Sequence, residues 1–215
     1  MTKNEYIPTK CYEPYQAYAR YIQSLYKVSY FEKRIQNFKN SKILDFGCGS
    51  GALVATINDH YPNIDISGFD NRPEAIEDCS NTLFPRIKSK IFNDRKFLEP
   101  YEIIISQYVS AYINHDKFFE ELNELLFPKG FLIIETTKSD LISFLQRIDY
   151  RIWKISKESY SKWFELIEKR SSLITNRTFD FTQKSYSKVR MKFLLDSVMS
   201  VFNQTDSELL ILRKK

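Results

Sequence analysis

The stretch KILDFGCGSG, residues 42–51, decides the fold of this chain. Its first five residues are mainly apolar and predict a short buried strand. Three alternating glycines follow, and residues 52–57 (ALVATI) predict a helix directly after them. A strand, a glycine turn and a helix in this order place backbone N–H groups and the positive end of a helix beside a ligand. Glycine is needed in such a turn because a Cβ atom would block both a positive φ and the close approach of the ligand.

The charge beside the turn indicates which ligand it holds. Residues 47–52 (GCGSGA) also fit the dinucleotide-binding pattern G-x-G-x-x-G/A. A diphosphate on the turn would lie close to the carboxylate of Asp45, and like charges at that distance repel. A ligand with a sulfonium and an ammonium group would instead be attracted. Asp45 therefore favours a positively charged nucleoside over NAD.

The same stretch resembles the first motif of the class I S-adenosylmethionine (SAM) dependent methyltransferases, which has the form acidic-x-Gly-x-Gly-x-Gly. The resemblance spans residues 40–137. It implies SAM as the cofactor, S-adenosylhomocysteine (SAH) as the product, and contact between the loop and the cofactor. The implied loop contacts are Asp45, Gly47, Cys48, Gly49 and Gly51. Cys48 has no neighbouring base to activate it, so we expect free thiols there and at Cys11 and Cys79.

A second acidic residue follows the next predicted strand. Residues 64–69 alternate as a strand that ends at Asp70. An acidic side chain at that place accepts hydrogen bonds from both hydroxyls of a ribose. Alternatively, Asp70 caps the helix that Pro73 begins. Asn71 and Arg72 come next, and we expect them to flank the adenine.

A third acidic residue follows the predicted strand at residues 87–92. The resemblance implies that Asp94, with Asn93 before it, accepts a hydrogen bond from the adenine amino group. The alternative is that Asn93 and Asp94 only form a turn, which both residue types favour.

The acceptor of the methyl group is expected at the carboxyl edge of the sheet, after a fourth strand at residues 101–106. The backbone around Ser106 and Gln107 is expected to accept hydrogen bonds from the methionine ammonium of SAM. The expected acceptor-binding residues are Tyr108, Tyr112, Glu135, Tyr160 and Trp163. Tyr112 and His115 are the candidate catalytic bases, and the alternative for His115 is that it merely begins a helix.

Two helical segments are expected to cover the core formed by residues 40–137. Residues 12–38 carry aromatic residues at helical spacing and predict one broken helix or two short ones. In the resembling methyltransferases such a segment crosses the mouth of the cofactor site, so Tyr18 and Arg20 either contact the methionine end or only pack. Residues 138–183 predict a helical insertion over the acceptor site.

The predicted fold is α/β: a doubly wound, mostly parallel seven-stranded sheet of the Rossmann-like methyltransferase type, in one domain over residues 1–215. A fifth strand at residues 131–135 follows a helix over 115–127. Residues 185–214 then predict a helix and a closing antiparallel hairpin, with strands at 197–202 and 208–212. Such a hairpin is typical of methyltransferases and is a second argument against NAD.

The charge is unevenly distributed over the 215 residues. The net charge of +5 divides into +4 for residues 1–40, −6 for residues 41–150 and +7 for residues 151–215. The basic flanks either attract an anionic acceptor or are solvated helix faces. No apolar run approaches the ~20 residues of a membrane span, and the first residues lack the apolar core of a signal peptide. We expect no membrane association, a cytoplasmic location and no bound metal.

These observations favour methyl transfer from SAM to an oxygen or nitrogen of a small-molecule acceptor. The basic, aromatic flanks leave RNA as the alternative acceptor. Outside the methyltransferases, an NAD-linked oxidoreductase and a non-catalytic SAM-binding protein remain. The sequence does not determine the oligomeric state.

Overall fold

The computed structural model describes residues 14–73, 84–107, 109, 115–137, 155–171 and 207–215. The α-helices are α1 (Pro14–Arg34), α2 (Ala52–His60), α4 (His115–Glu124) and α6 (Lys157–Ser161). The strands are β1 (Lys42–Phe46), β2 (Asp65–Phe69), β3 (Ile91–Phe92), β4 (Tyr101–Gln107), β5 (Leu126–Thr137), β6 (Phe164–Ser171) and β7 (Ser207–Lys214). The 3-10 helices are η1 (Phe38–Asn40), η2 (Pro85–Lys90) and η3 (Arg95–Phe97).

These strands form one seven-stranded sheet in the order β3-β2-β1-β4-β5-β7-β6. Strands β1 to β5 pair in parallel with their neighbours, and β7 is antiparallel to both β5 and β6. The carboxyl ends of β1 to β5 therefore lie at one edge of the sheet. The expected mostly parallel Rossmann-like methyltransferase sheet is confirmed, including its antiparallel closing strand.

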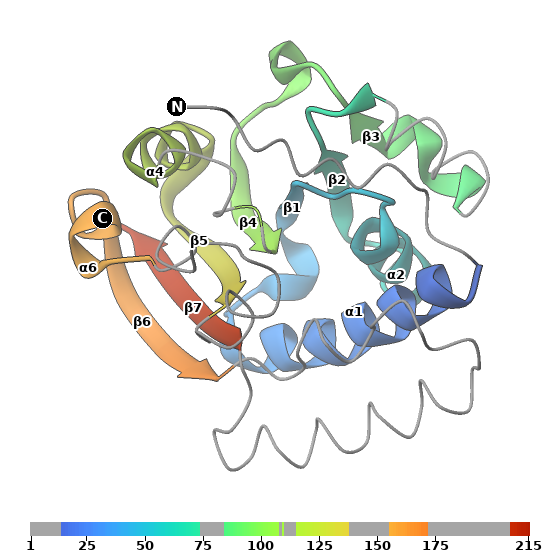
Figure 1. The fold of residues 1–215 in the computed structure, drawn as a ribbon, viewed down its shortest axis with the longest axis horizontal. Coiled ribbons are helices and arrows are strands. Elements are labelled where there is room, and N and C mark those ends of the chain that lie inside the picture. The colour runs from blue at the N-terminus through green and yellow to red at the C-terminus, as the bar shows by residue number, and fades with distance from the viewer. Residues whose placement is uncertain (1–13, 74–83, 108, 110–114, 138–154, 172–206) are drawn as a thin grey trace, which may run out of the picture.

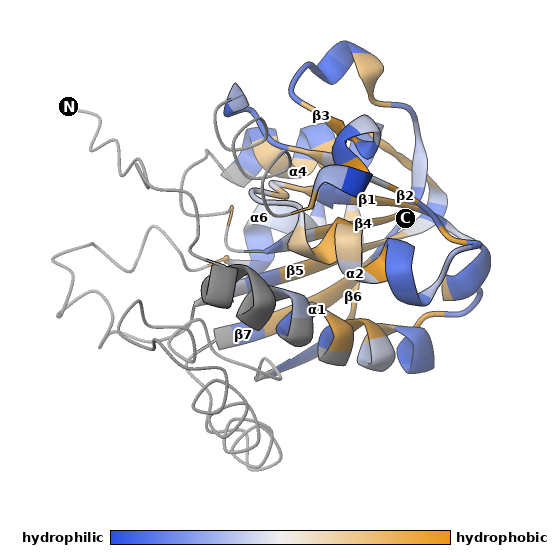
Figure 2. Cartoon of the chain, turned by 90° about the vertical axis from the view of Figure 1, so that its right-hand side faces the viewer, coloured by the Kyte–Doolittle hydropathy of each residue, from blue (hydrophilic) through white to orange (hydrophobic). Residues whose placement is uncertain are grey.

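The sheet is covered on both faces, with α1 and α2 on one side and α4 on the other (Figure 1). Neighbouring residues of β1 point to opposite faces of the sheet. Ile43 packs in the core beneath α1 and α2, and Leu44 packs in the core beneath α4. Both are fully buried, as expected for a central parallel strand. Figure 2 shows the hydrophobic residues gathered on the strands and on the inward sides of the helices.

Several elements differ in their bounds from the sequence-based expectation. The aromatic segment before β1 forms one continuous helix, α1, in which Val28 and Phe31 are buried, and Ile35 just after its end continues this buried stripe. Most of the expected third strand is the 3-10 helix η2, which leaves β3 two residues long. Strand β5 begins earlier than expected because Leu126 already pairs with Tyr101, and a register shift in this pairing lies next to the Pro-Lys-Gly sequence.

The largest correction concerns the closing hairpin. Its strand at the chain end, β7, was expected, but its antiparallel partner is β6, residues 164–171. The sequence had placed these residues in a helical insertion, because Tyr160, Trp163, Phe164 and Ile167 follow helical spacing. Within the described residues 155–171, α6 is the only helix, and Phe164 instead packs as a strand residue against Phe119 of α4.

Several expected elements lie outside the described residues. They are the helix over 185–196, the strand at 197–202, and the parts of the 138–183 insertion at residues 138–154 and 172–183. The described helices include none with the length and apolar character needed to cross a lipid bilayer.

Candidate cofactor site

The glycine turn joins the carboxyl end of β1 to the start of α2. Gly47, Gly49 and Gly51 have φ values of 86°, 51° and 75°, which L side chains rarely adopt. The turn is anchored to β2, because the backbone N–H groups of Gly47 and Cys48 donate to the Phe69 carbonyl at 2.7 and 2.9 Å. Sequence spacing thus placed this turn correctly at the carboxyl edge of the sheet.

The three glycines serve different purposes. A Cβ on Gly47 would lie 2.1 Å from Val109 Cγ2, and a Cβ on Gly51 would lie 2.6 Å from Ile87 Cδ1. These two glycines are therefore required by packing within the protein. Among the described residues, the atom nearest to a Cβ on Gly49 would be Arg72 Nη2, at 3.9 Å. Gly49 thus gives the turn an open side, as a cofactor lying along the backbone requires.

Asp70 directly follows β2 and lies against this open side. Its Oδ2 accepts a hydrogen bond from the Gly49 N–H at 2.9 Å, and its Oδ1 accepts one from the Arg72 N–H at 3.1 Å. The Arg72 side chain adds two more, from Nε to Oδ1 at 3.0 Å and from Nη2 to Oδ2 at 3.2 Å. The structure thus brings Asp70, Arg72 and the glycine turn together, as expected. The pairing of Asp70 with Arg72 was not foreseen.

Asp45 is the second buried carboxylate of the site, with 4% of its surface exposed. Burial and, to a smaller extent, the charge of Asp70 raise the pKa of Asp45 to about 8, although the charge of Lys27 acts in the opposite direction. Burial likewise raises the pKa of the Cys48 thiol well above its usual value, with Asp45 and Asp70 contributing. Cys48 is therefore held as a neutral thiol, which makes it a poor nucleophile.

A buried ion pair was missed by the sequence analysis. Lys27 of α1 bonds to Glu135 of β5, and their side chains are only 3% and 1% exposed. The two residues are 108 positions apart, and the available signal was a lysine among the apolar residues that α1 buries. Glu135 lies at the expected edge of the sheet, but Lys27 neutralises its charge there.

The end of β4 carries two buried polar groups that have no partner among the described residues. Ser106 and Gln107 end this strand, and Gln107 pairs in register with Glu135. Ser106 Oγ and Gln107 Nε2 are both buried and have no hydrogen-bond partner within the described ranges. Such buried groups are uncommon in proteins and suit contact with a ligand.

The structure does not bring every predicted residue to this edge. Tyr160 and Trp163 precede β6, which runs parallel to β5, so they lie near the amino edge of the sheet. Tyr160 is buried there against Phe119, with ring centroids 6.0 Å apart, because α6 packs on α4. Their expected role in acceptor binding is therefore not supported by their position.

The remaining predicted residues lie beside η3, next to Asp70, or outside the described residues. Asp94 follows β3 beside the exposed Asn93 and caps η3, its carboxylate accepting from the Lys96 N–H at 3.0 Å. Asn71 is exposed next to Asp70. Tyr108 and Tyr112, and the side chains of Tyr18, Arg20 and His115, lie outside the described residues. Within the described ranges, no cluster of metal-ligating side chains occurs.

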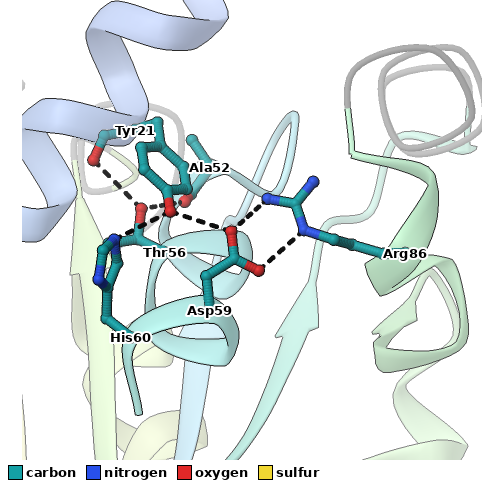
Figure 3. Close-up of polar contacts among 6 residues, drawn as sticks. All are labelled: Tyr21, Ala52, Thr56, Asp59, His60 and Arg86. Atoms are coloured by element: carbon teal, nitrogen blue, oxygen red, sulfur yellow. Dashed lines mark hydrogen bonds and ion pairs between the residues drawn. The ribbon is translucent and has the colours of Figure 1, made fainter. Parts of the chain in front are cut away.

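A polar network at the far end of α2 holds α1 in place (Figure 3). The Tyr21 hydroxyl donates to Asp59 at 2.9 Å and lies 3.0 Å from His60 Nε2. Arg86 donates to the same Asp59 carboxylate from Nε at 2.8 Å and from Nη2 at 2.5 Å. This network joins α1, α2 and η2, and its role is structural.

Comparisons with known proteins show which family this chain belongs to. Residues 37–185 match a family described as Methyltransferase domain. A plantazolicin methyltransferase in complex with SAH has a similar structure, with 17% identity, a TM-score of 0.53, and coverage of 94% of this chain and 85% of that one. Coclaurine N-methyltransferase bound to N-methylheliamine and SAH matches with 14% identity, a TM-score of 0.55 and coverage of 89% and 72%.

A cyclopropane synthase from Mycobacterium tuberculosis matches with 15% identity, a TM-score of 0.57, and coverage of 88% of this chain and 84% of that one. At these identities the structural likeness shows a shared fold. The family match covers more than half of the chain and includes the glycine turn, Asp70 and β4. The chain therefore belongs to the methyltransferase domain family and is a SAM-dependent methyltransferase.

Proposed function

We propose that this enzyme methylates a nitrogen or oxygen of a small-molecule acceptor. The observation that carries the proposal is that Ser106 Oγ and Gln107 Nε2, at the end of β4, are buried and have no hydrogen-bond partner in the part of the chain that the structure describes. Because these groups are buried, an acceptor can contact them only if it, or a part of it, enters the protein interior. A hydroxyl and a carboxamide suit a polar acceptor, because each can donate or accept a hydrogen bond.

The donor set at the glycine turn fits SAM. Gly49 leaves backbone open to a ligand, and Asp70 offers carboxylate oxygens to a ribose. Asp45 offers a buried carboxyl group whose ionised form a cationic ligand would stabilise. Asp94 remains the candidate for the adenine amino group. When bound, SAM supplies a methyl group that its sulfonium leaving group makes electrophilic.

The chain's own contribution is mainly positioning. Aligning an acceptor with a bound reactant contributes several kcal/mol of barrier lowering, about 7 or more in well-oriented cases. A base is needed only where the acceptor is protonated. His115 and Tyr112 remain the proposed bases. Glu135 is better suited to holding α1 on the sheet than to acting as a base, because it is held in a buried ion pair with Lys27.

Known structural relatives and the chain's charge pattern suggest which acceptors to test. Coclaurine N-methyltransferase was crystallised with N-methylheliamine, and the plantazolicin enzyme acts on plantazolicin. These names support small or peptide acceptors. The net charges of +4 and +7 on the two flanks favour an anionic acceptor, and they also make RNA the second candidate.

The test is transfer of labelled methyl groups from SAM into cell extract, with and without ribonuclease treatment, followed by separation by mass. We expect label in the low-mass fraction regardless of ribonuclease. Label only in ribonuclease-sensitive material would make the protein an RNA methyltransferase. An Asp70→Asn variant controls for label that does not depend on this site, and absence of label from every extract would favour a non-catalytic SAM-binding protein.

A further inference from the structure

The Asp70 carboxylate has a fully occupied set of hydrogen-bond partners. Its two oxygens provide about four acceptor positions. Two are taken by backbone N–H groups, of Gly49 at 2.9 Å and of Arg72 at 3.1 Å. The other two are taken by the Arg72 side chain, from Nε at 3.0 Å and Nη2 at 3.2 Å. The side chain of Arg72 thus places two donors on one carboxylate, as the two hydroxyls of a ribose would.

The position of Arg72 over the turn gives a second, independent observation. Arg72 Nη2 is the nearest atom to a Cβ built on Gly49, which is the glycine with an open side. The guanidinium therefore lies on the side of the turn from which a ligand approaches. Arg72 and a bound nucleoside would compete for the same place.

We propose that Arg72 is an affinity-setting residue that competes with the cofactor's ribose for Asp70. The inference rests on the role of Asp70 in the proposed function. Cofactor binding then requires the guanidinium to leave the carboxylate. The two backbone bonds from Gly49 and Arg72 remain and keep Asp70 oriented. The Arg72 side chain is 41% exposed, so it moves into water at modest cost.

The test is calorimetric titration of SAH into the wild type and into Arg72→Gln. Removing the competing ion pair is expected to tighten SAH binding by about 1.5-fold to fivefold, the range for a partly exposed pair. Arg72→Lys keeps the charge but loses the two-donor geometry, and an intermediate gain is expected. Thermal melting of each variant confirms that it folds.

The chain offers a matched control in Arg86. Its side chain is 44% exposed and makes the same two-donor contact, with Asp59, away from the glycine turn. Arg86→Gln is expected to leave SAH affinity unchanged. In an Asp70→Asn background, Arg72→Gln should give no gain, because the group for which the two partners compete is gone. Adenosine should show the gain and 2′,3′-dideoxyadenosine should not.

The possible failures are distinguishable. Equal or weaker SAH binding by Arg72→Gln, with normal binding by the wild type, would overturn the competition and leave the cofactor site intact. A gain that persists in the Asp70→Asn background would show that Arg72 acts elsewhere and would also overturn it. Failure of the wild type to bind SAH at all would overturn both this inference and the assignment of the site.

Discussion

At the scale of single residues, the two buried carboxylates of the site differ in how their charge is balanced. Asp70 accepts four hydrogen bonds from Gly49 and Arg72. Asp45 instead lies in a buried place where the charge of Asp70 acts against its ionisation, and its pKa rises to about 8. A cationic ligand beside Asp45 would favour its ionised form and so bring the pKa down.

This difference predicts that SAM binding depends on pH through Asp45. In the free protein Asp45 keeps its proton below about pH 8, and a cationic cofactor displaces that proton. Affinity should therefore rise with pH up to about 8 and then level off. Titrations of SAM in two buffers with different ionisation enthalpies measure the released proton directly.

The Asp45→Asn variant provides the reference, because the pH dependence that comes from the ionisation of SAM itself is the same for both proteins. Its pH dependence should be flatter than that of the wild type by the contribution of one proton. If SAM affinity changed with pH equally in both proteins, or if the wild type bound SAM more tightly at lower pH, Asp45 would not be the group that releases the proton.

At the scale of elements, the strand, turn and helix formed by β1, the glycines and α2 act as one unit. Gly51 is fixed by contacts inside the protein, with Ile87 and Ile91 only 2.6 and 2.7 Å from a Cβ built on it. Gly49 has no such contact and faces the ligand side. The requirement for folding and the requirement for binding are thus separated between two glycines of the same turn.

Alanine substitutions should separate these requirements. Both cost about 1 kcal/mol or more, because both positions have positive φ. Gly51→Ala adds the cost of overpacking, about 1–3 kcal/mol. We therefore expect Gly51→Ala to lower the denaturation midpoint more, and Gly49→Ala to weaken SAH binding more relative to its loss of stability. The reverse ranking in the two assays would contradict these roles.

The ion pair between Lys27 and Glu135 connects α1 to β5. Lys27→Met leaves a buried carboxylate without its cation, which typically costs about 3–5 kcal/mol. The double variant Lys27→Met/Glu135→Leu should recover most of that loss, because neither charge is then buried. Urea denaturation of the three proteins tests this. A single variant as stable as the wild type would show that the pair contributes little.

The elements that sequence reasoning located well are those specified by local pattern. The glycine turn and the neighbouring strands β1, β2 and β4 follow from apolar runs and from the positive φ that glycine permits. Strand β6 was missed, because its exposed Leu166 and Ile167 lie at a register shift that breaks the alternation of a strand. Lys27 and Glu135 were not paired, because nothing local links residues so far apart.

At the scale of the whole molecule, charge is separated between the core and its flanks. Residues 41–150 carry a net charge of −6, whereas the preceding and following segments carry +4 and +7. The acidic part includes Asp45 and Asp70, which suits a cationic cofactor. The basic segments suit an acceptor of the opposite sign.

This separation predicts a salt effect that depends on the acceptor. The range of surface electrostatics falls from about 10 Å at 0.1 M salt to about 3 Å at 1 M. The Michaelis constant of an anionic acceptor should therefore rise several-fold between low and high salt, while that of a neutral acceptor stays nearly constant. Steady-state kinetics over a salt series measures both, and a salt-independent constant for the anionic acceptor would leave the flanks without this role.

The central claim is that the open side of the glycine turn, with Asp70 beside it, holds the nucleoside of SAM. A crystal structure of the protein with SAH tests it most directly. We predict adenosine along the turn, with both ribose hydroxyls on Asp70 and the Arg72 guanidinium displaced from it. Adenosine bound elsewhere, with the turn unchanged, would contradict the account.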